Sequence, residues 1–558
     1  MMLRRILAAA ALVTNVVAFS STLGMINAPI IPKYLDNPKT PGSNPWQHKT
    51  ADQVNPNDIP YTGVVRRYHF TIGRATIAPD GVDRPVILVN GQFPGPTIEA
   101  NWGDTIQVTV KNEILDPAEG TAIHWHGLRM LETQWMDGVP STVQCPITPG
   151  KSFTYEFTAD AYGSTFWHSH YGAQYSAGTF GPIIIHGPEH AQYDIDLGPV
   201  FLSDWYHADY VEVVQSVVGL PAPTTQAYSD NNLINGRMPF DCSNPNITTN
   251  HLTCSSNATY SKFQFTKGKT YRLRVMNVSS QGFQRFSIDN MNMTVIANDF
   301  IPIVPYETDV LSIGIGQRAD ILIHATGDST DAVWMRSDVS EKCSVSYQGH
   351  AKAAIYYEDA DLTQLPNTTA TQYDDSYCGN VPLNVTTPVY AMDPPSDPAT
   401  TQRLDIRFLT NSTGNRLWYV NNNTFRANYE HPILLLAKAG NVSYPNPDCQ
   451  HPMHLHGHNY WIVAEGLGEW DGVANLKNPM RRDTFVLQPG DPIKGASYMV
   501  MDFVTDNPGV WPLHCHLAWH EHPEKIRNLQ IPSDVYQTCH DWANYKGVDL
   551  VPEIDSGV

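Results

Sequence analysis

The sequence predicts an all-β fold of β-sandwiches or barrels, and three observations support this prediction. Short segments alternate apolar and polar residues or run apolar throughout, among them DTIQVTVKN, KSFTYEFTA, GPIIIHG, KTYRLRVMN and ADILIHA. Proline (42) and glycine (38) punctuate these segments densely, and few long stretches have helical period and caps. Because 558 residues exceed what one core usually serves, we expect three domains.

The composition is that of a packed globular protein, with 16% charged and 42% hydrophobic residues. The formal net charge of −20 argues against nucleic acid and anionic membranes as partners.

Residues 1–20 have the pattern of a secretory signal. Two arginines precede an apolar run from Ile6 to Phe19, and small residues follow it. The run is short and is interrupted by Asn15, which disfavours a membrane span. A mitochondrial presequence and a signal anchor are the alternatives. We therefore expect a secreted, extracellular protein that contacts no membrane.

The remaining chain divides at changes in composition. Residues 21–60 are rich in proline and asparagine and are expected to form an extension. Strand segments then fall into a first domain over 61–190 and a second over 191–370. The third domain, 371–558, includes a polar, proline-rich connector at its start and a C-terminal tail.

The sequons and the cysteines agree with secretion. Nine asparagines stand in Asn-x-Ser/Thr motifs and are candidate glycosylation sites: Asn246, Asn257, Asn277, Asn292, Asn367, Asn384, Asn411, Asn422 and Asn441. In an oxidising compartment most of the eight cysteines should pair. Cys242 could bond Cys254, and Cys343 could bond Cys378, which would leave Cys145 to join Cys539 across the chain. Spacing alone does not prove these pairings, and Cys449 is left over.

Ten histidines gather in four clusters that each contain a His-x-His pair. The clusters are HWHG (His124, His126), WHSH (His168, His170), HPMHLHGH (His451, His454, His456) and HCHLAWH (His514, His516, His520). Side chains alternate faces along a strand, so each pair sends both imidazoles to one side. One such pair would be an ordinary coincidence. Four pairs supply eight imidazoles, enough for one multinuclear metal site.

The strand that carries HCH is expected to serve two metal sites. Cys515 faces away from His514 and His516, and it can share a second site with His451 and His520. A His₂Cys set is typical of electron-transfer copper, and a histidine-only set suits copper that handles oxygen. Zinc is the competing metal, but it prefers closed four-coordinate sets and would not use the short covalent path between the sites.

These motifs, their order and their placement at both ends of the chain resemble multicopper oxidases, and most closely the laccases of ascomycete fungi. The resemblance covers nearly the whole mature chain, including NGQFPGPTIEANWGDTIQVTV, QWMDGVP, QCPI, LINGR and DNPGVWPLHCH. It implies three consecutive cupredoxin-like domains, four coppers per chain, one-electron oxidation of substrates and reduction of dioxygen to water. It also favours the Cys145–Cys539 bridge and a C-terminal plug in DSGV, residues 555–558.

Carried over residue by residue, the resemblance implies a complete ligand set. The type 1 ligands would be His451, Cys515 and His520; the type 2 ligands His124 and His454; one type 3 copper would take His126, His168 and His516, and the other His170, His456 and His514. Asp137 in WMDGV matches an acidic residue that assists proton delivery, which suits oxygen reduction because that reaction consumes protons. A turn residue before Gly138 is the plainer interpretation of Asp137. His520 would be the electron entry.

The chain departs from the family pattern in two places. The family has an apolar axial residue ten positions after the cysteine, where this chain has Lys525. An ammonium group beside copper is costly to bury, so either an insertion moves Ile526 into the axial place or the type 1 site is altered. The stretch CSSNATYSKFQF also lacks the carboxylate that fungal laccases often place near the substrate, and Asp241 lies upstream of it.

We therefore expect a monomeric secreted laccase that oxidises small phenolic or aromatic reductants with O₂, with lignin or pigment metabolism as its setting. The alternatives are a metallo-oxidase of iron or copper, an ascorbate oxidase, or a non-catalytic copper-binding cupredoxin protein if the type 1 site is broken. The 15 methionines show no cluster that would favour a metallo-oxidase.

Overall fold

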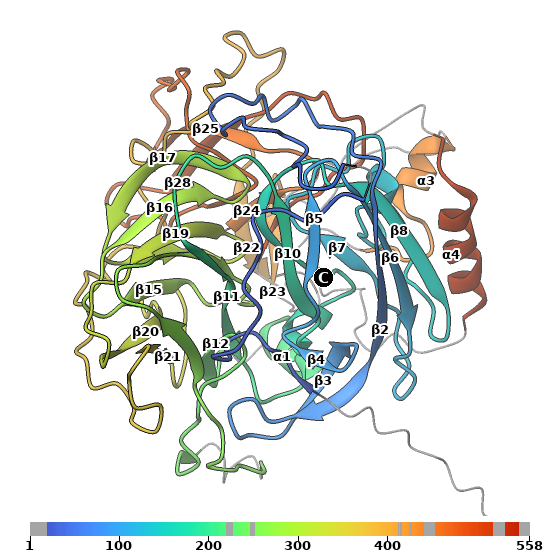
Figure 1. The fold of residues 1–558 in the computed structure, drawn as a ribbon. Helices are drawn as coiled ribbons and strands as arrows, with labels where there is room; N and C mark the ends of the chain where they lie inside the picture. Colours follow the sequence, from blue (N-terminus) through green and yellow to red (C-terminus); the bar gives the residue numbers. More distant parts are fainter. Residues whose placement is uncertain are drawn as a thin grey trace, which may run out of the picture.

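The computed structural model is nearly all β, as predicted (Figure 1). It describes residues 19–38, 40–218, 227–245, 252–410, 412, 414, 416–422, 427–439, 452–516 and 530–545. The strands form three groups of sheets that follow one another along the chain, which we call the first, second and third sandwiches.

The first sandwich packs a six-stranded sheet on a four-stranded sheet. The larger sheet has the order β1 (Phe19–Ser20), β4 (Gln92–Phe93), β3 (Arg84–Val89), β2 (Val65–Ile77), β6 (Thr105–Asn112) and β8 (Ser152–Thr158). The smaller has the order β5 (Ile98–Asn101), β10 (Phe180–His186), β9 (Gly163–Ser169) and β7 (Ile123–Trp125). In β6 the apolar residues Ile106, Val108 and Val110 are fully buried and their neighbours are partly exposed, as period-two patterning requires.

The second sandwich holds eleven strands in two sheets. One has the order β12 (Asn231–Ile234), β11 (Ile195–Trp205), β14 (Thr270–Asn277), β19 (Arg318–His324), β16 (Met293–Asn298) and β17 (Ile301–Thr308). The other has the order β13 (Ser261–Phe265), β21 (His350–Tyr357), β20 (Ala332–Val339), β15 (Gln284–Ile288) and β18 (Leu311–Ile313). Its core is aliphatic and aromatic and separate from that of the first sandwich.

In the part of the chain that the structure describes, the third sandwich has fewer strands than the other two. Its sheets have the orders β27 (Thr484–Val486), β24 (Pro452–Leu455), β29 (Leu513–Cys515) and β26 (Arg481–Arg482), β25 (Tyr460–Leu467), β28 (Ser497–Asp502). A hairpin of β22 (Ile406–Thr410) and β23 (Arg416–Val420) precedes them. Its buried core includes Leu455, Tyr460, Ile462 and Phe485.

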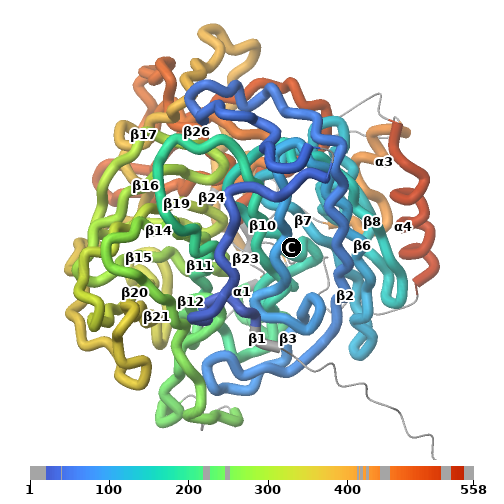
Figure 2. Tube along the Cα trace, in the orientation of Figure 1, coloured from blue at the N-terminus to red at the C-terminus, as the bar shows by residue number. Residues whose placement is uncertain are grey.

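The described residues form few helices, namely α1 (Tyr210–Val218), α3 (Ile433–Lys438), α4 (Ser533–Asn544) and the 3₁₀ turns η1 (Gln134–Met136) and η2 (Gln174–Ala177). The C-terminal helix α4 lies beside β6 and β8 of the first sandwich (Figures 1 and 2). It is bonded there by a disulfide between Cys539 and Cys145. Within the described ranges, none of the helices is long and apolar enough to cross a bilayer.

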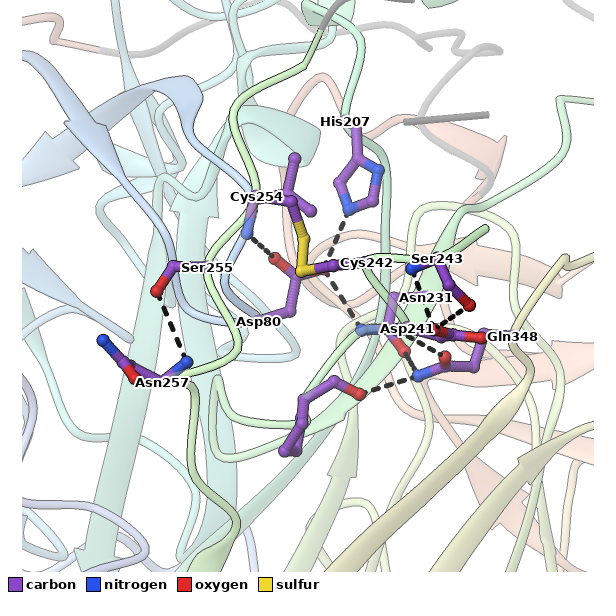
Figure 3. Close-up of a disulfide and its surroundings, with 12 residues drawn as sticks. Asp80, His207, Asn231, Asp241, Cys242, Ser243, Cys254, Ser255, Asn257 and Gln348 are labelled. Carbon is purple, nitrogen blue, oxygen red and sulfur yellow. Dashed lines mark hydrogen bonds and ion pairs between the residues drawn. A yellow bond between two sulfur atoms is a disulfide. The ribbon is translucent and has the colours of Figure 1, made fainter. Parts of the chain in front are cut away.

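The other two expected disulfides, Cys242–Cys254 and Cys343–Cys378, are also present. Figure 3 shows the first of them beside Asp80. The Asp80 carboxylate accepts hydrogen bonds from His207 Nε2 at 2.8 Å and from Asn231 at 3.1 Å. The bridge closes a loop of the second sandwich, and Cys254 pairs through its backbone with Val82 in a turn of the first.

The structure corrects one expectation about glycosylation. Asn277 is fully buried in β14, and its side-chain amide donates to the carbonyls of Gly282 and Ile313, so the folded protein has no room for a glycan there. Phe19 and Ser20 pair with β4 as strand β1, and the leader over residues 1–20 stays a prediction.

The other sequons divide by exposure. Five are exposed, namely Asn257, Asn292, Asn367, Asn384 and Asn422. Three lie outside the described residues, namely Asn246, Asn411 and Asn441.

Candidate metal centre

Strand pairing brings the histidine motifs together in two antiparallel pairs. In the first sandwich β7 pairs with β9, and His124 stands directly opposite His168. In the third sandwich β24 pairs with β29, and His454 stands directly opposite His514. The second histidine of each motif follows the end of its strand. Four local patterns therefore become two matched halves of one cluster.

All eight imidazoles of the His-x-His pairs are buried and face one another. Ring centroids of the two halves lie 3.9 Å apart for His126 and His454 and 4.1 Å apart for His124 and His456. The ligand nitrogens of His170, His456 and His514 all lie within 4.8 Å of one another, as do those of His124, His126 and His168. The first of these groups has the same members as one of our two type 3 sets.

The protein fixes the orientation of four of the eight rings through a contact between Nδ1 and a main-chain carbonyl. That nitrogen faces a carbonyl oxygen in His124 (Asp137, 2.8 Å), His168 (Ser169, 3.0 Å), His454 (Asp483, 2.8 Å) and His514 (Cys515, 3.0 Å). A carbonyl oxygen only accepts, so Nδ1 carries the proton and Nε2 keeps its lone pair. Such outer partners set the ligand nitrogen in metal sites.

His126 is held the other way round. Its Nε2 lies 3.2 Å from the Thr484 hydroxyl and 3.3 Å from the Asp483 carboxylate, while its Nδ1 faces His516 Nε2 at 3.0 Å. The proton therefore sits on Nε2, and Nδ1 is the nitrogen turned toward the cluster.

These contacts fit a bound cation. His456 donates from Nδ1 to the Asp137 carboxylate at 2.8 Å, and His514 donates from Nδ1 to a carbonyl. Their Nε2 atoms, which keep the lone pairs, lie only 2.8 Å apart. Two lone pairs at this distance repel unless a proton or a metal ion stands between them.

Burial also keeps six of the eight imidazoles in their metal-binding form. Desolvation, reinforced by neighbouring imidazoles, lowers the pKa of five histidines well below 6.5: His126, His168, His454, His456 and His516. For the same reasons the pKa of His170 falls to about 3. Neutral imidazole is the form that binds metal, so no proton competes with it near neutral pH.

Asp137 joins the two halves. It is fully buried at the end of η1, its main-chain carbonyl holds His124, and its carboxylate holds His456. One residue thus orients a histidine from the first sandwich and one from the third. A position beside two cluster imidazoles agrees with the predicted role in proton delivery, which stays a prediction.

A buried amide that sequence inspection missed supports the first half. Gln174 accepts hydrogen bonds from Thr121 and Ser169, both at 2.9 Å, and donates to the Glu119 carboxylate at 2.7 Å and to the Gly120 carbonyl. Ser169 stands between His168 and His170. The sequence signals Gln174 only as an uncharged polar residue, and the stretch around it proves to be buried.

A buried ion-pair network, also missed, supports the second half and reaches His126 of the first. Asp483 pairs with Arg318, and Asp299 pairs with Arg482, all four being buried. Arginine and aspartate within otherwise apolar strands, as in GQRADILI and MRRDTF, are the signal that could have predicted it.

The predicted type 1 site is only partly in view. Cys515 is buried in β29 opposite Met453, with His514 and His516 on either side of it in sequence. His451, His520, Ile526 and Lys525 lie outside the described residues, as do Cys449 and the DSGV tail. Asp241 is exposed and accepts bonds from Ser243 (Figure 3).

Comparison with known proteins agrees with this geometry. Three models described as multicopper oxidase match residues 71–190, 196–360 and 393–534. Oxidoreductase OpS5 of Beauveria bassiana is 37% identical over 89% of both chains, and Laccase-2 of Botryotinia fuckeliana is 33% identical over 92% of both. The crystal structure of a laccase from Botrytis aclada superposes with a TM-score of 0.82 at 33% identity, over 92% of this chain and 98% of that one.

The matches confirm the prediction of three cupredoxin-like domains and of copper as the cofactor, with four ions per chain. The chain therefore belongs to the multicopper oxidase family, as a laccase-like oxidoreductase.

Proposed function

We propose that this protein is an extracellular, monomeric laccase that oxidises small phenolic or aromatic molecules by single electrons and reduces O₂ to water. The observation that carries the proposal is the buried cluster of eight imidazoles whose lone pairs converge next to Cys515. Relatives named laccase, and one named dihydrogeodin oxidase, support a small-molecule reductant.

The proposed ligand set is the one implied by the motifs. His451, Cys515 and His520 would bind the copper that accepts electrons, and the eight described histidines would bind the other three. Copper, when bound, would supply the one-electron chemistry and the binding of dioxygen. The chain itself provides a short covalent path for electrons between the two proposed sites, because Cys515 is bonded in sequence to His514 and to His516.

The protein also provides for protons. Reduction of one O₂ to two waters takes four electrons and four protons, and the cluster is closed to solvent by burial. The Asp137 carboxylate accepts a hydrogen bond from His456 Nδ1 and lies 3.2 Å from His124 Nδ1. It is placed to hold a proton beside the cluster.

Secretion is supported by the leader pattern and by the three disulfides, which persist in oxidising compartments. Removal of a leader from the N-terminus would be read by N-terminal sequencing of the protein recovered from culture medium.

The test of function is the visible spectrum of the copper-loaded protein, followed by oxygen uptake with a simple phenol. We expect an intense blue band and four phenol molecules oxidised per O₂ consumed. A Cys515→Ser variant should lose the blue band and the uptake. Uptake that is faster with Fe(II) than with any phenol would contradict the phenol oxidase assignment, and no blue band would contradict a working type 1 site.

A further inference from the structure

We propose that Arg318 of the second sandwich is a positioning residue for the histidine cluster, which it serves by holding the Asp483 carboxylate in place. None of the predicted copper ligands comes from the second sandwich. The inference rests on the copper-binding role proposed above for the histidines, and it assigns the second sandwich a part in that site.

The second sandwich forms one wall of the cluster. Between β18 and β19 the chain passes Gly316, which has a positive φ of 79°. A Cβ atom at Gly316 would lie 3.0 Å from His516 Cγ and 3.3 Å from His126 Cε1. The backbone here touches a histidine of each half, and Arg318 follows two residues later.

Arg318 contacts all three sandwiches. It is fully buried, and its two terminal nitrogens donate to the two oxygens of Asp483 at 2.5 and 2.7 Å. Its Nε donates to the Ser164 carbonyl of the first sandwich at 3.2 Å. A planar guanidinium with two parallel bonds fixes the carboxylate in direction as well as in distance, which a lysine cannot do.

Asp483 in turn fixes two cluster histidines from opposite halves. Its carboxylate accepts from the Thr484 hydroxyl at 3.0 Å and lies 3.3 Å from His126 Nε2, so it helps to keep the His126 proton on Nε2. Its main-chain carbonyl holds His454 Nδ1. Without Arg318 the carboxylate would be a buried charge with no cation to balance it, and it would have to rotate or take a proton.

The space behind the HWHG motif is filled by this ion pair. Gly127 has a φ of 75°, and a Cβ atom there would lie 2.5 Å from Asp483 Oδ2 and 2.7 Å from Arg318 Nη2. The glycine that follows His126 therefore lets the guanidinium–carboxylate pair approach the strand end. The pair is packed against the backbone of the motif that it orients.

Arg318 is itself held before any metal arrives. Its backbone N–H donates to Asp299, whose carboxylate also receives two bonds from Arg482. Burial alone would lower the pKa of Arg318, but Asp483 and Asp299 outweigh it and raise the pKa above its usual range. The guanidinium is thus a fixed charge, and its geometry is set by the second and third sandwiches together.

The experiment compares Arg318→Met and Arg318→Lys with the parent in the copper-loaded full chain. Electron paramagnetic resonance reads the type 2 copper, near-ultraviolet absorption reads the type 3 pair, and the blue band reports separately that the third sandwich is folded. We expect Arg318→Met to keep the blue band, to change or lose the type 2 and type 3 signals, and to lower oxygen uptake by ~10–100-fold. The copper signals and oxygen uptake of Arg318→Lys should fall between those of the parent and those of Arg318→Met, because lysine keeps the charge but not the paired bonds.

Arg336→Met is the matched control. Arg336 makes two bonds to Asp289 at 2.7 and 2.8 Å within the same sandwich, and no cluster histidine is among its hydrogen-bond partners. This variant should lose stability but keep all copper signals.

Three outcomes would overturn the inference. Parent-like type 2 and type 3 signals in Arg318→Met would remove the positioning role, and equal damage in Arg336→Met would reduce it to general stability. A parent chain with no copper signals at all would overturn the proposed function as well, which separates the two failures.

Discussion

The two halves of the histidine cluster have the same strand geometry but different support. Pairs β7–β9 and β24–β29 both place histidines directly opposite each other. The first half lies in a sandwich of ten strands and is held by a neutral amide, Gln174. The second half lies in a sheet that has three strands among the described residues, and it is held by Asp483, whose carboxylate pairs with Arg318 of the second sandwich.

This difference shows how a small sandwich can carry a precise site. A large core, which includes Trp102, Trp125 and Trp167, packs the strands of the first half. Among the described residues, the third sandwich has a smaller buried core. Two contacts tie it to the other sandwiches. Arg318 of the second sandwich pairs with Asp483, and Cys145 of the first sandwich is bonded to Cys539.

The largest effect should come from removing one histidine of each half. His168→Ala and His514→Ala should each lower oxygen uptake by more than the ~100-fold that outer-partner changes reach, because each removes a converging lone pair. Oxygen uptake and type 3 absorption are the measurements, and His350→Ala, on an exposed surface, is the control. If either half tolerated the loss within ~10-fold, the two halves would not form one site.

Next in size is the bridge between the halves' sandwiches. Replacing Cys145 and Cys539 together by serine should lower the free energy of unfolding by about 2–5 kcal/mol, measured by denaturant titration. The chain-entropy model makes this bridge, with a separation of 394 residues, worth about 3 kcal/mol more than Cys242–Cys254, with a separation of 12. Equal losses in the two double variants would show that the long bridge does not hold the third sandwich in place.

Gln174→Met should have a smaller effect, confined to the first half. It leaves the Glu119 carboxylate without one donor and the hydroxyls of Thr121 and Ser169 without their acceptor. An unsatisfied buried group costs about 1–3 kcal/mol, so the melting temperature should fall while the blue band stays. A shift of the blue band with unchanged type 3 absorption would contradict this assignment, because it would show that Gln174 supports the second half of the cluster and not the first.

The smallest effect concerns the partly buried Glu465 on β25 of the third sandwich. Burial raises the pKa of Glu465 from 4.5 to about 7. Between these values the folded state binds more protons than the unfolded state, so stability falls as pH rises through that range.

The free energy of unfolding of the parent should therefore fall between pH 5 and pH 8. In Glu465→Gln this fall should be smaller by about 1 kcal/mol, after allowance for solvent screening. Unfolding curves for parent and variant at the two pH values give this difference. An unchanged difference would mean that water reaches the carboxylate.

Prediction from the sequence succeeded where the rule is local. His-x-His places two imidazoles on one face because strands have period two, and that holds wherever the strand lies. The rule does not reveal which nitrogen of a ring faces the cluster. His126 is inverted relative to His124 because Thr484 and Asp483, more than 350 residues away, accept its Nε2 proton.

Local patterns also misled in one place. Asn277 satisfies the sequon rule, but β14 lies in the middle of a sheet and turns the amide into the protein. A three-residue motif carries no information about burial, which depends on the strands on either side.

The sequence by itself determined the chemistry of the described cluster: its eight imidazoles, their pairing along strands, and the all-β class, all of which follow from short-range periodicity. Only the tertiary structure decided how the groups are oriented and charged. Gln174, Asp137 and Arg318 act on histidines through contacts between distant segments, and a hydrogen bond or ion pair of this kind exists only once the sandwiches are packed. The second sandwich, which has none of the ligand motifs, contributes to the site for this reason alone.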